Sequence, residues 1–201
     1  MLRTKRNQLK VDNWILDQVD SECDVEILSS FDCGDSDLNE YFQKESLLNK
    51  SALVGQPYFL YDATVDKIVP VALIDLCNDS IRKEGSKRQP GYLKVADIEE
   101  GKQFAFLPAV KITRFGVNKP FQRLNIGSHA LNMVKTLFIT ENRTGCRFIT
   151  VDAYNKTEVK NFYQKNDFKF FYDKDENKHT RSMFFDLKRL ILPGIEKNQD
   201  A

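Results

Sequence analysis

Apolar residues in the second half of the chain repeat with the spacing of an amphipathic helix, directly after a strand-like segment. Residues 110–117 form a strand-like segment. The helical spacing follows at Ala130, Leu131, Val134, Leu137 and Phe138. The sequence therefore predicts a strand, a short turn, and a helix that begins near Ile126.

The first half of the chain shows shorter patterns. We expect a first strand from Val25 to Leu28, and then a helix capped by Asp35 or Ser36 that runs to about Lys50. The apolar stripe of this helix is broken by charges and includes Leu38, Tyr41, Phe42 and Leu48. Segments 58–61 and 68–76 are expected to pair as a hairpin.

Composition and length set the domain organisation. The 201 residues, 41% of them hydrophobic, suffice for one domain over 1–189, with 190–201 as a C-terminal tail. Residues 78–106 are expected to form a polar insertion. Its basic residues are more typical of a solvated loop than of an RNA contact, and a role as a substrate lid stays open.

Charge and residue usage narrow the function classes. A net charge of +1 gives no strong attraction to nucleic acid or to an anionic membrane. The longest apolar run, 68–74, is too short to span a membrane, and the charged N-terminus lacks the apolar segment of a secretion signal, so we expect a cytoplasmic protein. Four scattered cysteines and two histidines lack metal-ligand spacing, so we expect no metal and reduced, mostly buried thiols.

The turn before the predicted helix has the chemistry of a phosphate site. The first N–H groups of a helix lack intrahelical acceptors and the helix dipole adds positive charge, so an anion near Ile126, Gly127 and Ser128 is favoured. Gly127 permits close approach to the main chain, and Ser128 adds a hydroxyl donor. An ordinary loop that enters a helix is an equal alternative on these residues alone.

The segment Gln122-Arg123-Leu124-Asn125-Ile126-Gly127-Ser128 resembles a motif of the GNAT superfamily of acyl-CoA N-acyltransferases. That motif is Gln or Arg, two residues, Gly, one residue, and Gly or Ala. Asn125 stands at the first glycine, and Asn tolerates left-handed backbone better than most residues. The resemblance implies that acetyl-CoA is bound by Phe115, Gly116, Val117, Gln122, Arg123, Leu124, Asn125, Ile126, Gly127, Ser128 and Asn155.

A second motif downstream carries the same resemblance. After a predicted strand over 148–153, Asn155 stands where the family bonds the pantetheine arm, and Tyr163 stands where a tyrosine lies beside the acyl-CoA sulfur. Asp167 replaces the family's glycine before Phe168. The resemblance implies a mixed α/β fold with a mostly antiparallel central sheet, splayed between its fourth and fifth strands, and helices on both faces.

The function implied by the resemblance is transfer of an acetyl group from acetyl-CoA to a primary amine, by direct attack in a ternary complex. Tyr163 would protonate the coenzyme A thiolate, and packing in the core is its alternative role. Asp75 and Asp152 are candidate bases, but the sequence identifies neither as catalytic.

Two other functions stay open. The segment Phe31-Asp32-Cys33-Gly34, before a helix and a hairpin, resembles a GNAT subgroup that includes toxins acetylating aminoacyl-tRNA, although a net charge of +1 does not promise the basic surface that RNA requires. Replacement of two motif glycines keeps open a non-catalytic acyl-CoA-binding module. The acceptor amine, an antitoxin partner and a homodimer are not decided by the sequence.

Overall fold

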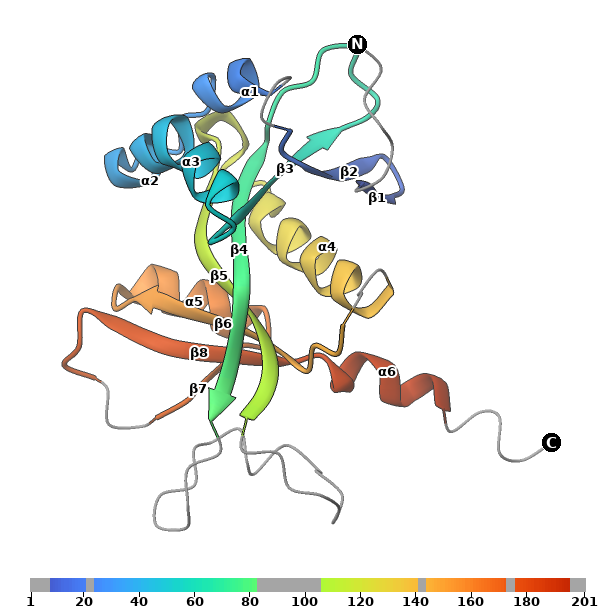
Figure 1. The fold of residues 1–201 in the computed structure, drawn as a ribbon, viewed down its shortest axis with the longest axis vertical. Coiled ribbons are helices and arrows are strands. Elements are labelled where there is room, and N and C mark those ends of the chain that lie inside the picture. Colours follow the sequence, from blue (N-terminus) through green and yellow to red (C-terminus); the bar gives the residue numbers. More distant parts are fainter. Residues whose placement is uncertain (1–7, 21–23, 83–105, 141–143, 173–175, 196–201) are drawn as a thin grey trace. The chain divides into compact units, whose positions relative to one another are not determined.

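The computed structural model describes residues 8–20, 24–82, 106–140, 144–172 and 176–195 (Figure 1). The chain divides into two compact units, which we call the N-unit (1–77 and 112–137) and the C-unit (78–111 and 138–201). The two longest strands, β4 (Ala72–Arg82) and β5 (Phe106–Val117), contribute residues to both units. The expectation of one domain over 1–189 stays a prediction.

Eight strands form one sheet. Besides β4 and β5, they are β1 (Gln8–Val11), β2 (Trp14–Gln18), β3 (Gln56–Asp62), β6 (Phe148–Tyr154), β7 (Lys169–Phe170) and β8 (Thr180–Asp186). Their order is β1-β2-β3-β4-β5-β6-β8-β7, and the pairs β1–β2, β2–β3, β3–β4, β6–β8 and β7–β8 are antiparallel. The prediction of a mixed α/β fold with a mostly antiparallel sheet is confirmed.

Short helices cover the core of the N-unit. They are α1 (Val25–Ser29), α2 (Ser36–Glu40), the π-helical η1 (Tyr41–Glu45), α3 (Ser46–Ser51), the 3-10 helix η3 (Lys119–Phe121) and the start of α4 (Ile126–Thr140). Asp35 caps α2, because its carboxylate accepts bonds from the N–H groups of Asp37 and Leu38. The predicted helix from 36 to about 50 is thus confirmed in three successive segments.

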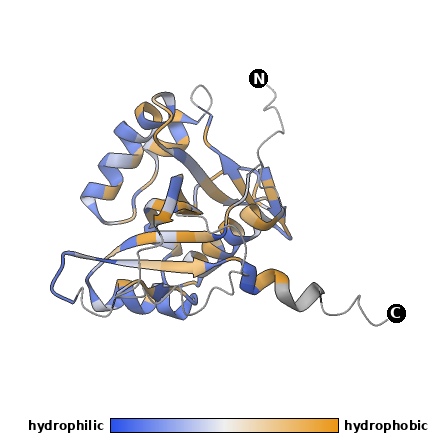
Figure 2. Cartoon of the chain, turned by 60° about the horizontal axis from the view of Figure 1, so that its bottom comes forward, coloured by the Kyte–Doolittle hydropathy of each residue, from blue (hydrophilic) through white to orange (hydrophobic). Residues whose placement is uncertain are grey.

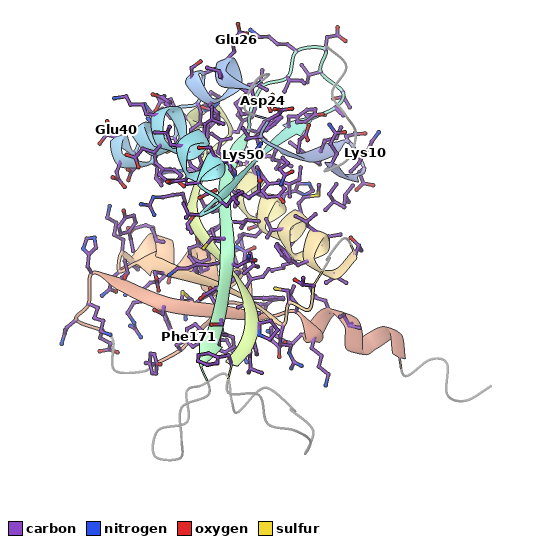
Figure 3. The ribbon with its side chains drawn as sticks, viewed as in Figure 1. Lys10, Asp24, Glu26, Glu40, Lys50 and Phe171 are labelled. Carbon is purple, nitrogen blue, oxygen red and sulfur yellow. The ribbon has the colours of Figure 1, made fainter. Side chains whose placement is uncertain are left out.

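The expectation of a strand at Val25 to Leu28 is wrong, because these residues form α1. In a strand with one buried face, every second side chain would be buried. Here Leu28 and Phe31 are buried with Ile27 packed beside them, and Val25 is 54% exposed. Glu26 points away from the core in Figure 3 and lies in the first turn, where the helix dipole favours a negative charge. Packing therefore overrides the strand propensity of Val and Ile.

The apolar stripe of the second helix also differs from the prediction. Leu48 is 67% exposed, whereas Ser46 is buried and Leu47 packs against the core. A π turn holds more residues than an α turn, so the positions four and five after Phe42 face inward.

The predicted hairpin is confirmed with shifted bounds. Its second strand begins at Ala72 rather than Ile68, since Pro70 has no N–H to donate to a ladder. It continues to Arg82, so residues 78–82 of the predicted insertion lie in β4 and Phe106 opens β5. The rest of the insertion, 83–105, lies outside the described residues.

The C-unit places α5 (Thr157–Lys165) and α6 (Lys188–Ile195) around its strands. Helix α6 occupies part of the predicted tail, which is therefore helical to Ile195. In Figure 2, orange segments run along several strands, while the helices alternate between orange and blue. The buried cluster of this unit consists of Ile81, Leu107, Ala109, Phe148 and Phe184, with Phe171 packed against it.

The described residues include three of the four cysteines. Cys33, Cys77 and Cys146 are half-buried rather than fully buried, and Cys33 and Cys146 are free thiols. Cys23 lies outside the described residues. Over the described part of the chain, no helix has both the length and the apolar character needed to cross a membrane.

Candidate functional site

The turn that precedes α4 holds two non-glycine residues in left-handed backbone, Arg123 with φ +61° and Asn125 with φ +64°. Asn125 occupies the position of the motif glycine, so its tolerance for this conformation keeps the turn. The N–H of His129 donates to the Asn125 carbonyl over 3.1 Å, which places the N–H groups of Ile126, Gly127 and Ser128 at the helix N-terminus. The turn itself is exposed, with Leu124 at 64%.

Gln122 connects this turn to the segment Phe31–Gly34 through hydrogen bonds. Its Nε2 donates to the carbonyls of Cys33 (2.7 Å) and Val117 (2.9 Å). Lys119 adds an ion pair to Asp32 over 2.7 Å, and its N–H donates to the Asp32 carbonyl. The two motifs that the sequence presents separately are therefore bonded to each other within the N-unit.

Gly116, in the predicted pantetheine edge, is required by close packing. A Cβ at this position would lie 3.0 Å from the Phe31 ring and 3.2 Å from both Cβ and Sγ of Cys33. Phe115 and Val117 on either side are half-buried. The end of β5 thus lies directly against the Phe31–Gly34 segment.

Gly116→Ala should destabilise the protein by about 1 to 3 kcal/mol, because the ring of Phe31 is fully buried and packs edge-on against Phe42, so it has little room to move. Urea unfolding measures the change. Gly145→Ala is the matched control, since nothing lies within 4 Å of a Cβ there. Equal stability of the two variants would contradict the packing role of Gly116.

The C-unit holds the other predicted residues. Tyr163 on α5 is buried at 5% exposure, with the rings of Phe162 and Phe168 at 5.1 Å and 5.3 Å, and burial raises the pKa of its phenol. The Asn155 side chain donates to the carbonyls of Glu176 (2.7 Å) and Lys178 (2.9 Å) and accepts from Lys160. In this structure Asn155 therefore anchors the approach to β8.

The end of α5 accommodates the second missing glycine. Asp167 has φ +66°, and its N–H donates to the Gln164 carbonyl while the Phe168 N–H donates to the Tyr163 carbonyl, both over 3.0 Å. These two bonds form a Schellman motif, which normally places glycine at this position. Asp167 performs the same role and directs Phe168 into the core beside Tyr163.

The two candidate bases have different environments. Asp75 is 1% exposed, and burial raises the pKa of its carboxyl although Tyr41 and Thr113 donate to its Oδ2 over 2.5 Å and 2.7 Å. Burial opposes ionisation of Asp152 as well, but donors from Lys111 and Ser182 bring the pKa of Asp152 below its ordinary value. Asp75 is thus enclosed and Asp152 is a weakened base, so the structure identifies no base.

A cavity of about 300 Å³ opens on the C-unit. It is lined by Asp79, Ser80, Ile81, Lys111, Thr150, Val151, Asp152, Phe171, Tyr172 and Ser182. Of these, the sequence singled out only Asp152. The alternation of polar Thr150 and Asp152 within an otherwise apolar strand was the available signal. Within the described residues, no group of His, Cys, Asp and Glu side chains is arranged to hold a metal ion.

The comparisons with known proteins place the fold. No protein-family model matches the sequence, and no curated protein matches it. Solved structures do match, among them a tyrosine-to-phenylalanine mutant of KacT (15% identity, TM-score 0.70, 90% of this chain and 99% of that chain). AtaT complexed with acetyl-methionyl-tRNAfMet matches at 17% identity and a TM-score of 0.65, over 90% of this chain and 98% of that chain. AtaTR bound with acetyl-CoA matches at 18% identity and a TM-score of 0.65, over 91% of this chain and 99% of that chain. The chain has a GNAT-like fold.

Proposed function

We propose that this protein is an N-acetyltransferase that moves an acetyl group from acetyl-CoA to a primary amine. The observation that carries the proposal is the turn 122–125, whose two left-handed residues lead into the N-terminus of α4 on a GNAT-like fold. The N–H groups at such a helix start suit a pyrophosphate. AtaT, a toxin with a similar fold, has been solved with acetyl-CoA bound.

The reaction needs little from the protein beyond positioning and a proton. A neutral amine nitrogen attacks the thioester carbonyl carbon, a C–N bond forms, and the C–S bond breaks. Coenzyme A leaves as a thiolate that takes a proton from the Tyr163 phenol, and the proton lost by the amine restores the phenol through solvent. Structures of AtaT and KacT include tyrosine-to-phenylalanine mutants, which directs attention to a tyrosine in this fold.

Acetyl-CoA at about 100 times its Kd should raise the melting temperature by about 5 °C or more, since ligand bound only to the folded state stabilises it. Gly127→Val should weaken binding about tenfold or more, because a branched side chain blocks approach to the main chain. Gly145→Val, at an exposed glycine outside the motif, is the control. A Gly127→Val variant with unchanged affinity would show that the phosphates bind elsewhere.

A second candidate is acetylation of aminoacyl-tRNA. The observation that favours it is the match to AtaT complexed with acetyl-methionyl-tRNAfMet over nearly the full length of both chains. Parallel assays with radiolabelled acetyl-CoA, one with charged tRNA and one with free amines, separate the two acceptors. Acetyl-CoA binding without transfer to either would favour the non-catalytic module. The free thiols of Cys33 and Cys146 suit a cytoplasmic location.

A further inference from the structure

We propose that the cavity of the C-unit binds the acceptor as a primary alkylammonium ion, with the ammonium on Asp79 and Asp152 and the apolar part against Phe171 and Tyr172. The bound ion loses one proton to solvent before its neutral nitrogen attacks the thioester. This inference rests on the proposed function, because it names the substrate class of that reaction. The cavity is more than a group of carboxylates, since residues of four strands and two aromatic rings line it, together with one lysine and the hydroxyls of Ser80, Thr150 and Ser182.

The charge of the lining favours a cation. Among the described residues, the charged side chains that line the cavity are Asp79, Asp152 and Lys111, and Lys111 forms an ion pair with Asp152. Within this described part of the lining, the carboxylate charges exceed the lysine charge by one. A small cation placed here would balance it, whereas an anion would add to it.

Both carboxylates accept a hydrogen bond from a hydroxyl on another strand of the sheet. The Thr150 hydroxyl donates to Asp79 Oδ2 over 2.5 Å, and the Ser182 hydroxyl donates to Asp152 Oδ1 over 2.6 Å. An ionised carboxylate has about four acceptor positions, so acceptors remain on each. Such fixed acceptors match the three N–H donors of an alkylammonium ion.

Two aromatic rings, those of Phe171 and Tyr172, add apolar surface to the cavity. Phe171, labelled in Figure 3, packs on Phe184 with ring centroids 5.0 Å apart and borders the buried cluster of the C-unit. Tyr172 beside it is 41% exposed. Aromatic faces attract both alkyl groups and cations, which favours an amine with an apolar substituent over a bare ion.

The cavity lies on one face of the sheet in the C-unit. It lies over β5 and β6, with Lys111 from the first strand and Thr150 and Asp152 from the second. Side chains alternate along β8, so Ser182 at the cavity and Phe185, which contacts Phe168 of the Tyr163 cluster, lie on opposite faces. The cavity and the Tyr163 cluster therefore lie on opposite faces of the sheet.

Titrations of isotopically labelled protein with phenethylamine, phenylalanine amide and phenethyl alcohol, followed by NMR, test the proposal. We expect one or both amines to shift the amides of residues 79–81, 150–152 and 182, and the uncharged alcohol to bind at least about tenfold more weakly. Preference for phenethylamine would indicate a free alkylamine acceptor, and preference for the amide would indicate an aminoacyl acceptor.

Variants locate the binding. Asp79→Asn and Asp152→Asn should each weaken the amines about tenfold, while Glu158→Gln, which removes an exposed carboxylate on α5, should not. Equal binding to the Asp79→Asn/Asp152→Asn double variant would overturn the proposal. Tighter binding of phenylacetate than of phenethylamine would also overturn it, since Lys111 would then define an anion site. If a variant fails to fold, the affinities of the unmodified protein for phenethylamine and phenethyl alcohol still test the proposal, because equal affinities would overturn it.

The acetyl-CoA thermal shift separates this inference from the proposed function. If acetyl-CoA raises the melting temperature but no amine binds at the cavity, only the proposed acceptor site in the cavity is rejected. Amine binding at the cavity without any effect of acetyl-CoA rejects the acetyltransferase and leaves the cavity as a site for organic cations.

Discussion

Replacing Tyr163 by phenylalanine should lower kcat about 100- to 10,000-fold while acetyl-CoA affinity stays within about twofold. The ring remains, so packing against Phe162 and Phe168 is kept and only the phenol proton is lost. Burial raises the pKa of Tyr163, so the phenol stays protonated throughout an assay from about pH 6 to 9 and can act as an acid. Because a thiolate is a tolerable leaving group, the low end of the range is expected. Rates of coenzyme A release measure the effect.

Tyr154→Phe provides the matched control. Tyr154 is a half-buried phenol on β6, edge-on to His179 at 5.4 Å, and lies in the same unit. Loss of the Tyr154 hydroxyl should leave kcat unchanged. A Tyr163→Phe enzyme with normal kcat and an unaltered pH profile would assign Tyr163 to core packing alone.

Arg147→Met should destabilise the fold by about 3 to 5 kcal/mol, because it leaves a buried carboxylate without its partner. Arg147 Nε and Nη2 donate to the two oxygens of Asp186 over 2.5 Å and 2.8 Å, and the Asp186 side chain is only 2% exposed. Asp186 also accepts the N–H of Lys188, so the pair fixes the start of α6. Thermal unfolding should show a fall of about 6 to 20 °C.

The exposed pair Lys44–Glu40 is the control for this prediction. Its side chains are 69% and 59% exposed, so Lys44→Met should cost at most about 1 kcal/mol. Adding Asp186→Leu to Arg147→Met should recover part of the loss, since this pair then leaves no buried charge behind. A single Arg147→Met variant as stable as Lys44→Met would show that Asp186 finds other partners.

Local rules predicted the parts of the fold in which neighbouring residues decide the structure. Asp35 caps its helix, and Asn125 adopts the left-handed backbone because short polar side chains tolerate it. The hairpin β1–β2 was missed: its strands carry polar residues, and its turn depends on Asp12 with φ +52°. Segment 25–28 was wrongly predicted as a strand, because tertiary packing there overrides the local strand propensity.

The cavity could not be predicted, because its residues meet only through the sheet. Thr150 bonds Asp79, which is 71 positions earlier, and the register of β6 and β8 places Asp152 opposite Ser182. Neither pairing leaves a local sequence pattern. The motif residues Gln122 and Asn155 matched the family in type, yet their amide groups bond main-chain carbonyls of this chain, a use that spacing does not reveal.

The bonds from Gln122 and Lys119 to the Phe31–Gly34 segment join the turn before α4 to the helices that follow Asp35. Local opening of either part would break bonds that the other requires, so the two form one cooperative unit against partial unfolding. A ligand that binds at the turn therefore protects residues it never contacts. Binding and folding are linked across the N-unit, and an acyl donor would act as a stabiliser of its helices as well as a reactant.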